Sequence, residues 1–317
     1  IRIMIRKLPL HPFRKIIIIV LNADKNWTAG RNISIAPAAG TKLCNRKGKG
    51  RCVNALLKYP GAKWRLAPWI ISHFPDHHSY LEPFFGSGAV LFNKPKSNIE
   101  TVNDLDDEVI NFFECIRRDP ERLARELYFT PYARKVYDQA YEEADDPFEK
   151  AMNFCIRLNQ GHGFRTTGEK VGWKNDVNGR ERAYAVRDWN TFPEKIMEAA
   201  DRLKDVQIEH MDAVDLIKRF CNKDVLIYCD PPYVLQTRSR KQYRCEMDNE
   251  QHEELLEVLA DHPGPVVISG YDSALYNKKL NGWYKETHPA YNMAVGPRKE
   301  VLWMNFEPEQ NQQQSLF

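Results

Sequence analysis

The sequence predicts an α/β fold interrupted by a mainly helical insertion, and three observations support this prediction. Short apolar runs bounded by turn residues alternate with amphipathic stretches in two regions, roughly 54–119 and 206–306, which is typical of strands and covering helices. Between them, residues 120–205 show helical spacing and little strand signal. Two apolar runs also end in distinctive turns, at 82–88 and 230–233, as expected at the carboxyl edge of a parallel sheet, where ligands bind.

The composition is that of a globular protein with a sizeable core. Hydrophobic residues make up 43% and charged residues 28% of the 317 residues, which are ordinary values. No apolar run approaches the roughly 18 residues that a membrane span requires. The 7 cysteines contain no C-x-x-C pair, so we expect neither a disulfide framework nor a structural zinc site, and a reducing, cytoplasmic location fits best.

The first 53 residues are strongly basic. They contain 12 Lys or Arg and a single acid, Asp24, whereas the whole chain carries a net charge of +3. Such a segment could bind nucleic acid by releasing counterions or act as an acid-poor targeting peptide. Because it shows no steady helical or strand period, we expect a poorly ordered basic leader. The Gln-rich tail at 307–317 is expected to fray.

Apolar spacing places the expected elements along the chain. A helix over 63–74 precedes a strand ending at Tyr80-Leu81, a helix starting at 89–92, a strand over 99–102 and a helix over 106–118. The insertion carries helices near 132–143 and 148–158, then a polar stretch at 159–182. The remaining elements are strands at 206–209, 225–229, 266–269 and 301–306 and helices at 213–220 and 249–259. We therefore expect one domain formed by 54–119 and 206–306, with 120–205 as an inserted subdomain.

The strongest chemical signal is Asp230-Pro231-Pro232-Tyr233, which directly follows the apolar strand 225–229. An exocyclic amine on a nucleobase is a poor nucleophile, because its lone pair is delocalised into the ring. The Asp230 carboxylate and the Pro231 carbonyl can each accept one N–H of such an amine and turn its lone pair towards an electrophile. Two successive prolines fix the backbone, and Tyr233 offers a flat face on which a purine can stack.

A second signal is the turn from Glu82 to Gly88, rich in small residues. Glycines after a first strand allow close approach of the backbone to a ligand. The dinucleotide fingerprint G-x-G-x-x-G is not met, because Leu91 stands where its third glycine would be. By itself the turn is compatible with a nicotinamide, a flavin or S-adenosylmethionine. Asp104, at the end of the next strand, is a candidate acceptor for ribose hydroxyls.

In their order along the chain, these motifs resemble those of the Dam-type (alpha-group) DNA adenine-N6 methyltransferases. The resemblance covers about residues 54–306 and rests on Lys58–Lys63, Glu82–Gly88, Asp104 and Asp230–Tyr233. Ala62 and Glu82 stand where glycine and aspartate are more usual. The resemblance implies a Rossmann-like, S-adenosylmethionine-dependent methyltransferase sheet and a target recognition subdomain at 120–205. It also implies transfer of a methyl group to the N6 amine of a flipped adenine in double-stranded DNA.

The resemblance further implies which residues form the sites. Asp230, Pro231, Pro232 and Tyr233 would be catalytic. Asp212 would lie near the adenine ring of S-adenosylmethionine. The complete expected cofactor site consists of Tyr59, Lys63, Glu82, Phe84, Gly86, Gly88, Asp104, Asp212 and Asp230. A restriction endonuclease partner is left open by the sequence, as are the recognition sequence and the oligomeric state.

Basic and aromatic residues in two loops are candidates for contacts with DNA, because Arg and Lys bind phosphates and Arg reads guanine. The extrusion of a base from the duplex costs a few kcal/mol, which phosphate contacts would help to offset. For each single residue a solvated surface position is an equally good interpretation. The DNA-binding candidates are Arg165, Lys170, Lys174, Arg238, Arg240 and Tyr243.

We expect no metal cofactor. Methyl transfer from a sulfonium is a direct displacement that requires no Lewis acid, and His77, His78 and His252 lack ligand spacing. Three alternatives remain: a methyltransferase acting on RNA or another amine, a non-catalytic DNA-binding relative, and, more distantly, a dinucleotide oxidoreductase.

Overall fold

The computed structural model describes residues 55–163, 165–175, 177, 184–238, 241–292 and 296–308. Within this part of the chain the side chains of 290–292 and 296–298 are not described. The basic leader expected over 1–53, Arg240 and most of the tail beyond residue 307 lie outside the described residues.

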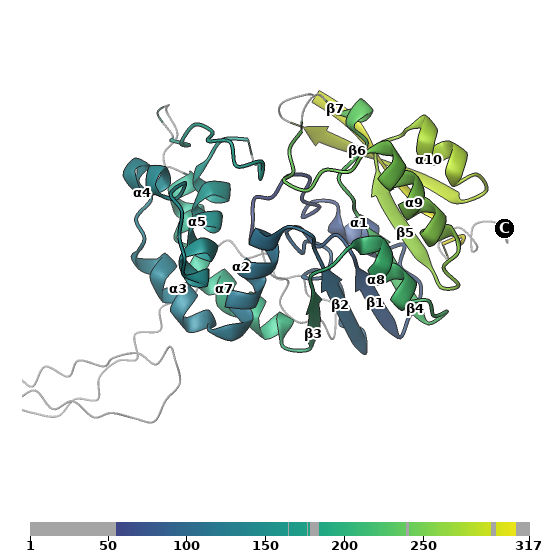
Figure 1. The fold of residues 1–317 in the computed structure, drawn as a ribbon, viewed down its shortest axis with the longest axis horizontal. Helices are drawn as coiled ribbons and strands as arrows, with labels where there is room; N and C mark the ends of the chain where they lie inside the picture. The colour runs from purple at the N-terminus through teal and green to yellow at the C-terminus, as the bar shows by residue number, and fades with distance from the viewer. Residues whose placement is uncertain are drawn as a thin grey trace, which may run out of the picture. The chain divides into compact units, whose positions relative to one another are not determined.

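A seven-stranded sheet forms the centre of the described chain (Figure 1). Its strand order is β3-β2-β1-β4-β5-β7-β6. The first five strands are mutually parallel, and β7 runs antiparallel to both β5 and β6. The parallel order 3-2-1-4-5 is that of a Rossmann-type sheet, which confirms the predicted fold class. The strands are β1 (Ser79–Glu82), β2 (Ile99–Asn103), β3 (Val206–Glu209), β4 (Val225–Cys229), β5 (Val266–Gly270), β6 (Tyr284–Asn292) and β7 (Gly296–Met304).

Successive residues of a strand point to opposite faces of the sheet. Each face of this sheet packs against its own hydrophobic core. In β4, Leu226 and Tyr228 join one core, whereas Val225, Ile227 and Cys229 join the other. All five are buried, as expected for a strand covered on both sides.

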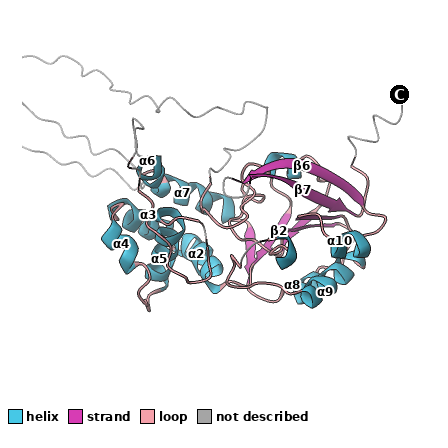
Figure 2. Cartoon of the chain, turned by 90° about the horizontal axis from the view of Figure 1, so that it is seen from above, coloured by secondary structure: helices cyan, strands magenta, loops and turns pink. Residues whose placement is uncertain are grey.

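Helices cover both faces of the sheet. Figure 2, which views the molecule from above, shows α8, α9 and α10 together beside the strands. Their buried residues belong to the core that contains Ile227 and Trp303. The opposite core contains Ile70 of α1 and residues of the helical insertion. These sheet-covering helices are α1 (Ala67–Ile71), α8 (Ala213–Arg219), α9 (Asn249–Ala260) and α10 (Ala274–Lys279), and a short 3-10 helix, η1, covers Leu235–Thr237.

The helical part of the chain is centred on α2, which packs against the insertion. Asp106 caps α2 by accepting the N–H of Glu108, and Asp119 ends α2 and caps α3, whose first residue is Pro120. The insertion was predicted to be mainly helical, and helices make up most of its described residues; its use in target recognition stays a prediction. Helices α2 to α5 and α7 lie together at the left of Figure 1, and Figure 2 shows α6 next to α7. They are α2 (Asp107–Arg118), α3 (Pro120–Phe129), α4 (Arg134–Gln139), α5 (Pro147–Gln160), α6 (Tyr184–Trp189) and α7 (Phe192–Leu203).

Two expected helices differ from the structure and one strand was not expected, and a proline bears on each. The helix expected over 63–74 spans only Ala67–Ile71, because Pro68 fits only the first turn. The helix expected from 89–92 is absent; isolated turns run up to Pro95, which disfavours helix at the residue before it. Strand β6 was not predicted, because it contains Pro289 among charged residues. An edge strand tolerates proline.

Candidate active site

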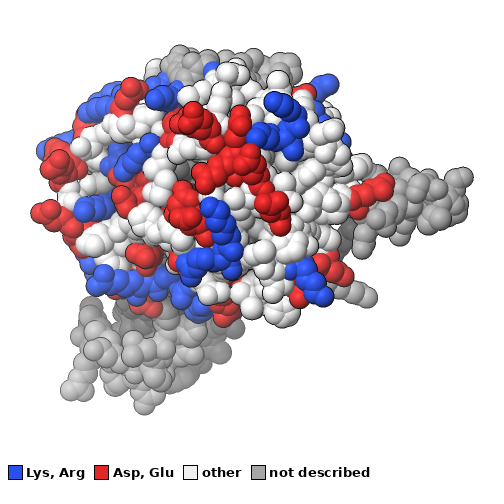
Figure 3. All heavy atoms as spheres, turned by 45° about the vertical axis from the view of Figure 1, so that its right-hand side comes forward, with Lys and Arg blue, Asp and Glu red and all other residues white. Residues whose placement is uncertain are grey.

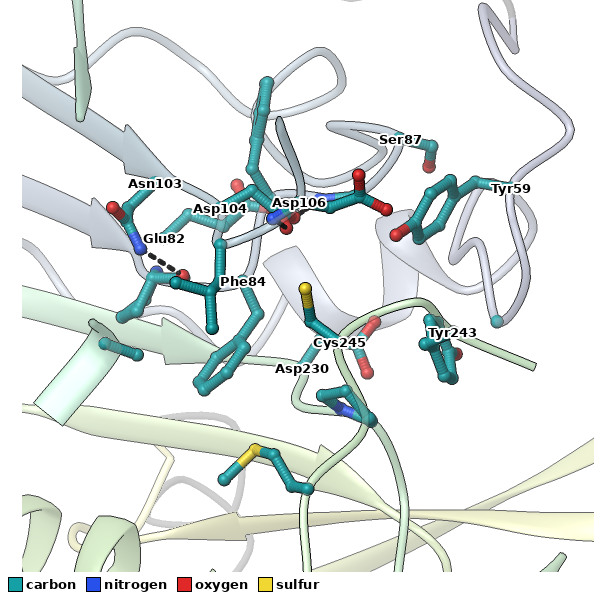
Figure 4. Close-up of a pocket in the computed structure, with 18 of the residues that line it drawn as sticks. Tyr59, Glu82, Phe84, Ser87, Asn103, Asp104, Asp106, Asp230, Tyr243 and Cys245 are labelled. Atoms are coloured by element: carbon teal, nitrogen blue, oxygen red, sulfur yellow. Dashed lines mark hydrogen bonds between the residues drawn. The ribbon is translucent and has the colours of Figure 1, made fainter. Parts of the chain in front are cut away.

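A cavity in the described structure opens at the carboxyl ends of β1, β2 and β4, where the sequence predicts a ligand site. Figure 4 shows Glu82, Phe84 and Asn103 towards one end of it and Tyr59 and Tyr243 towards the other. Most of the expected site residues line it, although they come from distant parts of the chain. The predicted residues that line the cavity are Tyr59, Lys63, Glu82, Phe84, Gly86, Asp104, Asp212, Asp230, Pro232 and Tyr243.

Two glycines shape the turn after β1. Gly86 has a φ of +48°, and its N–H donates to Oδ2 of Asp104 at 2.7 Å. A Cβ at this position would lie 3.1 Å from the ring of Tyr59, so the glycine lets the aromatic ring approach. Gly88 has a φ of +67°, and a Cβ there would lie 2.6 Å from Phe85 and Phe92. Gly88, expected at the cofactor, therefore packs beside the cavity without lining it.

Asp104 sits at the base of the cavity in backbone hydrogen bonds. Besides the Gly86 N–H, it accepts the N–H of Asp106 at 2.9 Å through Oδ1. Burial raises the pKa of Asp104 to about 6. The neighbouring Asn103 is fully buried and connects the turn after β1 to the loop before α8: its Nδ2 donates to the carbonyls of Pro83 and Met211, and its Oδ1 accepts the N–H of Met211.

Glu82 places a second acid in the cavity wall. Only 2% of its surface is exposed, and it accepts the hydroxyl of Tyr80 at 2.8 Å. Burial raises the pKa of Glu82 to about 8, and the charge of Asp230 contributes to this shift. At neutral pH Glu82 is therefore largely protonated.

Asp230 is held on both of its oxygens. Lys63 Nζ lies 2.9 Å from Oδ2, and the Ser269 hydroxyl donates to Oδ1 at 2.8 Å. Ser269 stands on β5, next to β4, so the sheet itself orients the carboxylate. Lys63 is almost fully buried; burial alone would lower its pKa, but the carboxylates of Asp230 and Glu300 raise the pKa above its ordinary value. Lys63 is thus a fixed cation.

Tyr233 was expected to offer an open ring face to a base, but the structure encloses it. It is 8% exposed, it is not among the residues that line the cavity, and its hydroxyl donates to Oε1 of Glu300. Lys63 Nζ lies over its ring, 4.8 Å from the centroid, and Tyr271 packs edge-on at 4.6 Å. Pro232, not Tyr233, is the part of the turn beyond Asp230 that lines the cavity.

The loop after η1 forms another wall of the cavity. Tyr243 was expected to contact DNA, but it forms part of this wall. Its ring centroid lies 6.0 Å from that of Tyr59, and its hydroxyl donates to the Pro60 carbonyl at 3.3 Å. Cys245 and Met247 from the same loop also line the cavity.

Arg238 was expected to contact DNA, but the structure places it inside the protein. Its side chain is 6% exposed and pairs with Glu246 through both terminal nitrogens, while Nε donates to the Tyr233 carbonyl at 2.7 Å. Glu246 also accepts the N–H groups of Gln242 and Tyr243. This arrangement corrects the expectation: Arg238 holds the loop that follows the Asp-Pro-Pro-Tyr turn.

Other expected DNA-binding residues lie at the surface of the insertion. The side chain of Lys170 is 51% exposed and pairs with Asp138 at 2.8 Å. Arg165 pairs with the exposed Glu169 at 3.0 Å, and Lys174 lines a shallow pocket near α6. On the face shown in Figure 3, basic and acidic side chains are interspersed. The charge on that face is therefore mixed.

Asp212 caps α8, where its Oδ1 accepts the N–H groups of Val214 and Asp215 at 2.8 and 3.2 Å. Asn103 and Glu300 were not predicted from the sequence as site residues. An acid within the apolar run Glu300-Val301-Leu302-Trp303 is the signal that was available.

Within the described ranges, no group of three or more His, Cys, Asp or Glu is arranged to hold a metal. The helices described are too short or too polar to cross a membrane.

Comparison with known proteins gives a family. The family described as D12 class N6 adenine-specific DNA methyltransferase matches residues 59–295. A DNA adenine methylase of Salmonella typhimurium is 28% identical over 269 residues, covering 78% of this chain and 92% of the relative. The DNA adenine methylase of Escherichia coli K12 is 28% identical over 247 residues, covering 73% and 84%. That of Haemophilus influenzae is 32% identical over 194 residues, covering 56% and 63%.

Proposed function

The chain belongs to the D12 class of N6 adenine-specific DNA methyltransferases, and we propose that its Asp230–Tyr233 turn is where the exocyclic amine of adenine is methylated. The observation that supports this most strongly is the position of Asp230. It directly follows β4, and Asp230 lines this cavity beside the glycine turn. The acceptor for the amine and the candidate cofactor site thus open into one space.

The residues of the cavity fit S-adenosylmethionine, which carries a sulfonium and an amino group. Asp104, Asp212 and Asp230 line it, so the wall favours a cationic ligand. Asp104 is placed to accept ribose hydroxyls, and Tyr59 offers a ring for packing. When bound, the cofactor supplies an electrophilic methyl group; binding and alignment are supplied by these side chains.

The protein's part in catalysis is to position the amine. The Asp230 carboxylate accepts one N–H and the Pro231 carbonyl accepts the other, which localises the lone pair on nitrogen. The nitrogen held in this way would take the methyl group from the sulfonium, which would leave as a neutral thioether, and the amine would then release one N–H proton towards Asp230, the acceptor of that hydrogen bond. Correct alignment of two reactants is worth up to about 7–11 kcal/mol of a barrier. The negative charge of Asp230 also stabilises positive charge that develops on the amine.

DNA binding is assigned to the outer surface of the insertion. Adenine must leave the duplex to reach the cavity, at a cost of a few kcal/mol. We place Arg165, Lys170 and Lys174 among the residues that bind the DNA backbone, because among the predicted cations that the structure describes they lie outside the buried network. The insertion (120–205) would then serve in target recognition.

The test is direct. The full chain is incubated with S-adenosylmethionine and unmethylated DNA, and the nucleosides are analysed by mass spectrometry. We expect N6-methyladenine from the wild type and none above background from Asp230→Ala, with the circular dichroism spectrum unchanged. Methylated RNA without methylated DNA would contradict the proposal, as would near-normal turnover by a folded Asp230→Ala protein.

A further inference from the structure

Glu300 is a buried acid that the proposed mechanism does not use. It lies in β7 opposite His288 of β6 and is 3% exposed. Because side chains alternate along a strand, Glu300 shares the face of β7 with Leu302 and Met304, whose side chains join the core on the α1 side of the sheet. The acid is therefore directed into protein on the side from which Lys63 approaches.

Glu300 contacts two residues of the site at once. Its Oε1 accepts the hydroxyl of Tyr233, and the same oxygen lies 3.6 Å from Nζ of Lys63. Lys63 in turn lies 2.9 Å from Asp230 and over the ring of Tyr233. One carboxylate on β7 thus fixes the last residue of the Asp-Pro-Pro-Tyr turn and competes with the first residue of that turn for the same ammonium.

From this geometry we infer that Glu300 is a positioning residue for methyl transfer: it anchors Tyr233 by its hydroxyl and shares the charge of Lys63 with Asp230. This inference rests on the proposed function of the Asp230–Tyr233 turn. A carboxylate that is fully neutralised by one ammonium is a weaker acceptor for the N–H of an amine. By attracting Lys63, Glu300 leaves Asp230 with more of its negative charge. It also sets the plane of the Tyr233 ring.

Burial protects the contact between Lys63 and Glu300 from water. The side chains of Lys63 and Glu300 are 6% and 5% exposed, so water cannot replace either partner at low cost. Burial raises the pKa of the Tyr233 phenol well above its ordinary value. The phenol therefore keeps its proton at neutral pH and acts as the donor to Glu300.

The test is a double-mutant cycle of Glu300→Leu and Tyr233→Phe. Single-turnover methylation is measured at saturating DNA and S-adenosylmethionine. We expect Glu300→Leu to lower the rate by about tenfold to hundredfold, in line with the loss of hydrogen bonds to a charged group. Tyr233→Phe should lower it less, and the double variant should be no slower than Glu300→Leu, because both changes remove one shared contact. Equilibrium binding of S-adenosylmethionine should stay within about threefold of the wild type.

Glu300→Gln protects the test against a folding defect of the leucine variant. Glutamine keeps the shape and can still accept the Tyr233 hydroxyl but carries no charge, so its rate should lie between those of the wild type and Glu300→Leu. Folded glutamine and leucine variants with wild-type rates would overturn the inference, as would additive effects in the cycle. If the wild type itself forms no methyladenine, the proposed function fails instead, and the two failures are therefore distinguishable.

Discussion

The site and the insertion use lysine in opposite ways. Lys63 has a side chain that is 6% exposed and lies within reach of two carboxylates. Lys170 has a side chain that is 51% exposed and pairs with one half-exposed acid, Asp138. The buried lysine contributes structure and fixed charge, whereas the exposed one is only weakly held and remains available to a polyanion such as DNA. Burial, rather than the residue type, thus separates the two roles.

Removal of the buried lysine should give the largest effect on stability. Lys63→Met leaves Asp230 and Glu300 facing each other without a cation. We expect the free energy of unfolding to fall by about 3–5 kcal/mol at neutral pH. One unpaired carboxylate should then take up a proton in the folded state, so stability should partly recover as the pH is lowered towards the ordinary carboxylate range. Urea unfolding at several pH values measures both effects; a loss that does not depend on pH would argue against an unpaired carboxylate.

Arg238 extends the comparison to the loop after the Asp-Pro-Pro-Tyr turn. Arg238→Met should lower the free energy of unfolding by about 3 kcal/mol, because it leaves Glu246, whose side chain is only 12% exposed, without its cation. The salt dependence of DNA binding should not change, since Arg238 is not at the surface. The double variant with Glu246→Gln is the matched control and should recover part of the lost stability. A reduced salt slope would return Arg238 to the DNA-binding residues.

Glu82 provides a pH test of the same cavity. Burial raises its pKa from 4.5 to about 8, so between these values the folded protein binds one proton more than the unfolded chain. The free energy of unfolding should therefore fall as the pH rises through this range. Glu82→Gln lacks this titration. Its stability advantage over the wild type should appear above about pH 5 and reach a few kcal/mol by about pH 9. Parallel pH profiles from urea unfolding of the cofactor-free proteins would contradict the prediction.

The smallest expected effect belongs to the exposed lysine. Lys170→Ala should weaken DNA binding a few-fold and reduce the salt slope by about 1, the value for one phosphate contact. Lys96→Ala is the matched control. The side chain of Lys96 is 50% exposed and pairs with Asp205 at 2.7 Å, but Lys96 precedes β2 and therefore lies at the amino ends of the parallel strands, whereas the cavity lies at their carboxyl ends. Both variants should keep the free energy of unfolding within about 0.5 kcal/mol. Equal DNA affinities for both, measured by fluorescence anisotropy, would remove Lys170 from the interface.

The parallel strands and the catalytic turn could be predicted from the sequence, because each is recognised from a few consecutive residues. An apolar run followed by Asp230-Pro231-Pro232-Tyr233 identifies both a buried strand and its functional end. Edge strand β6 was missed, because a strand at the rim needs little apolar patterning and tolerates Pro289. Strand β6 pairs only with β7 among the described strands.

The site was predicted less completely, since its electrostatics depend on distant contacts. Tyr233 and Glu300 are 67 residues apart, and no local pattern connects them. Arg238 looked like a DNA-binding residue because its neighbours are basic, yet Glu246, eight positions later, neutralises it. A list of charges cannot distinguish a buried pair from a solvated one; that distinction requires the tertiary structure.

The order of the strands also bears on how the protein is made. Strand β7 lies between β5 and β6, although the ribosome synthesises both of those strands before it. Until residues 296–304 emerge, β6 has no partner in the sheet and Glu300 is absent from the site. Chains fold from the N-terminal part onwards as they are synthesised, so a nascent chain that already contains Asp230 and Tyr233 would still lack the anchor for the Tyr233 hydroxyl. Methylating activity should therefore appear late in translation, when the last strand of the sheet is in place.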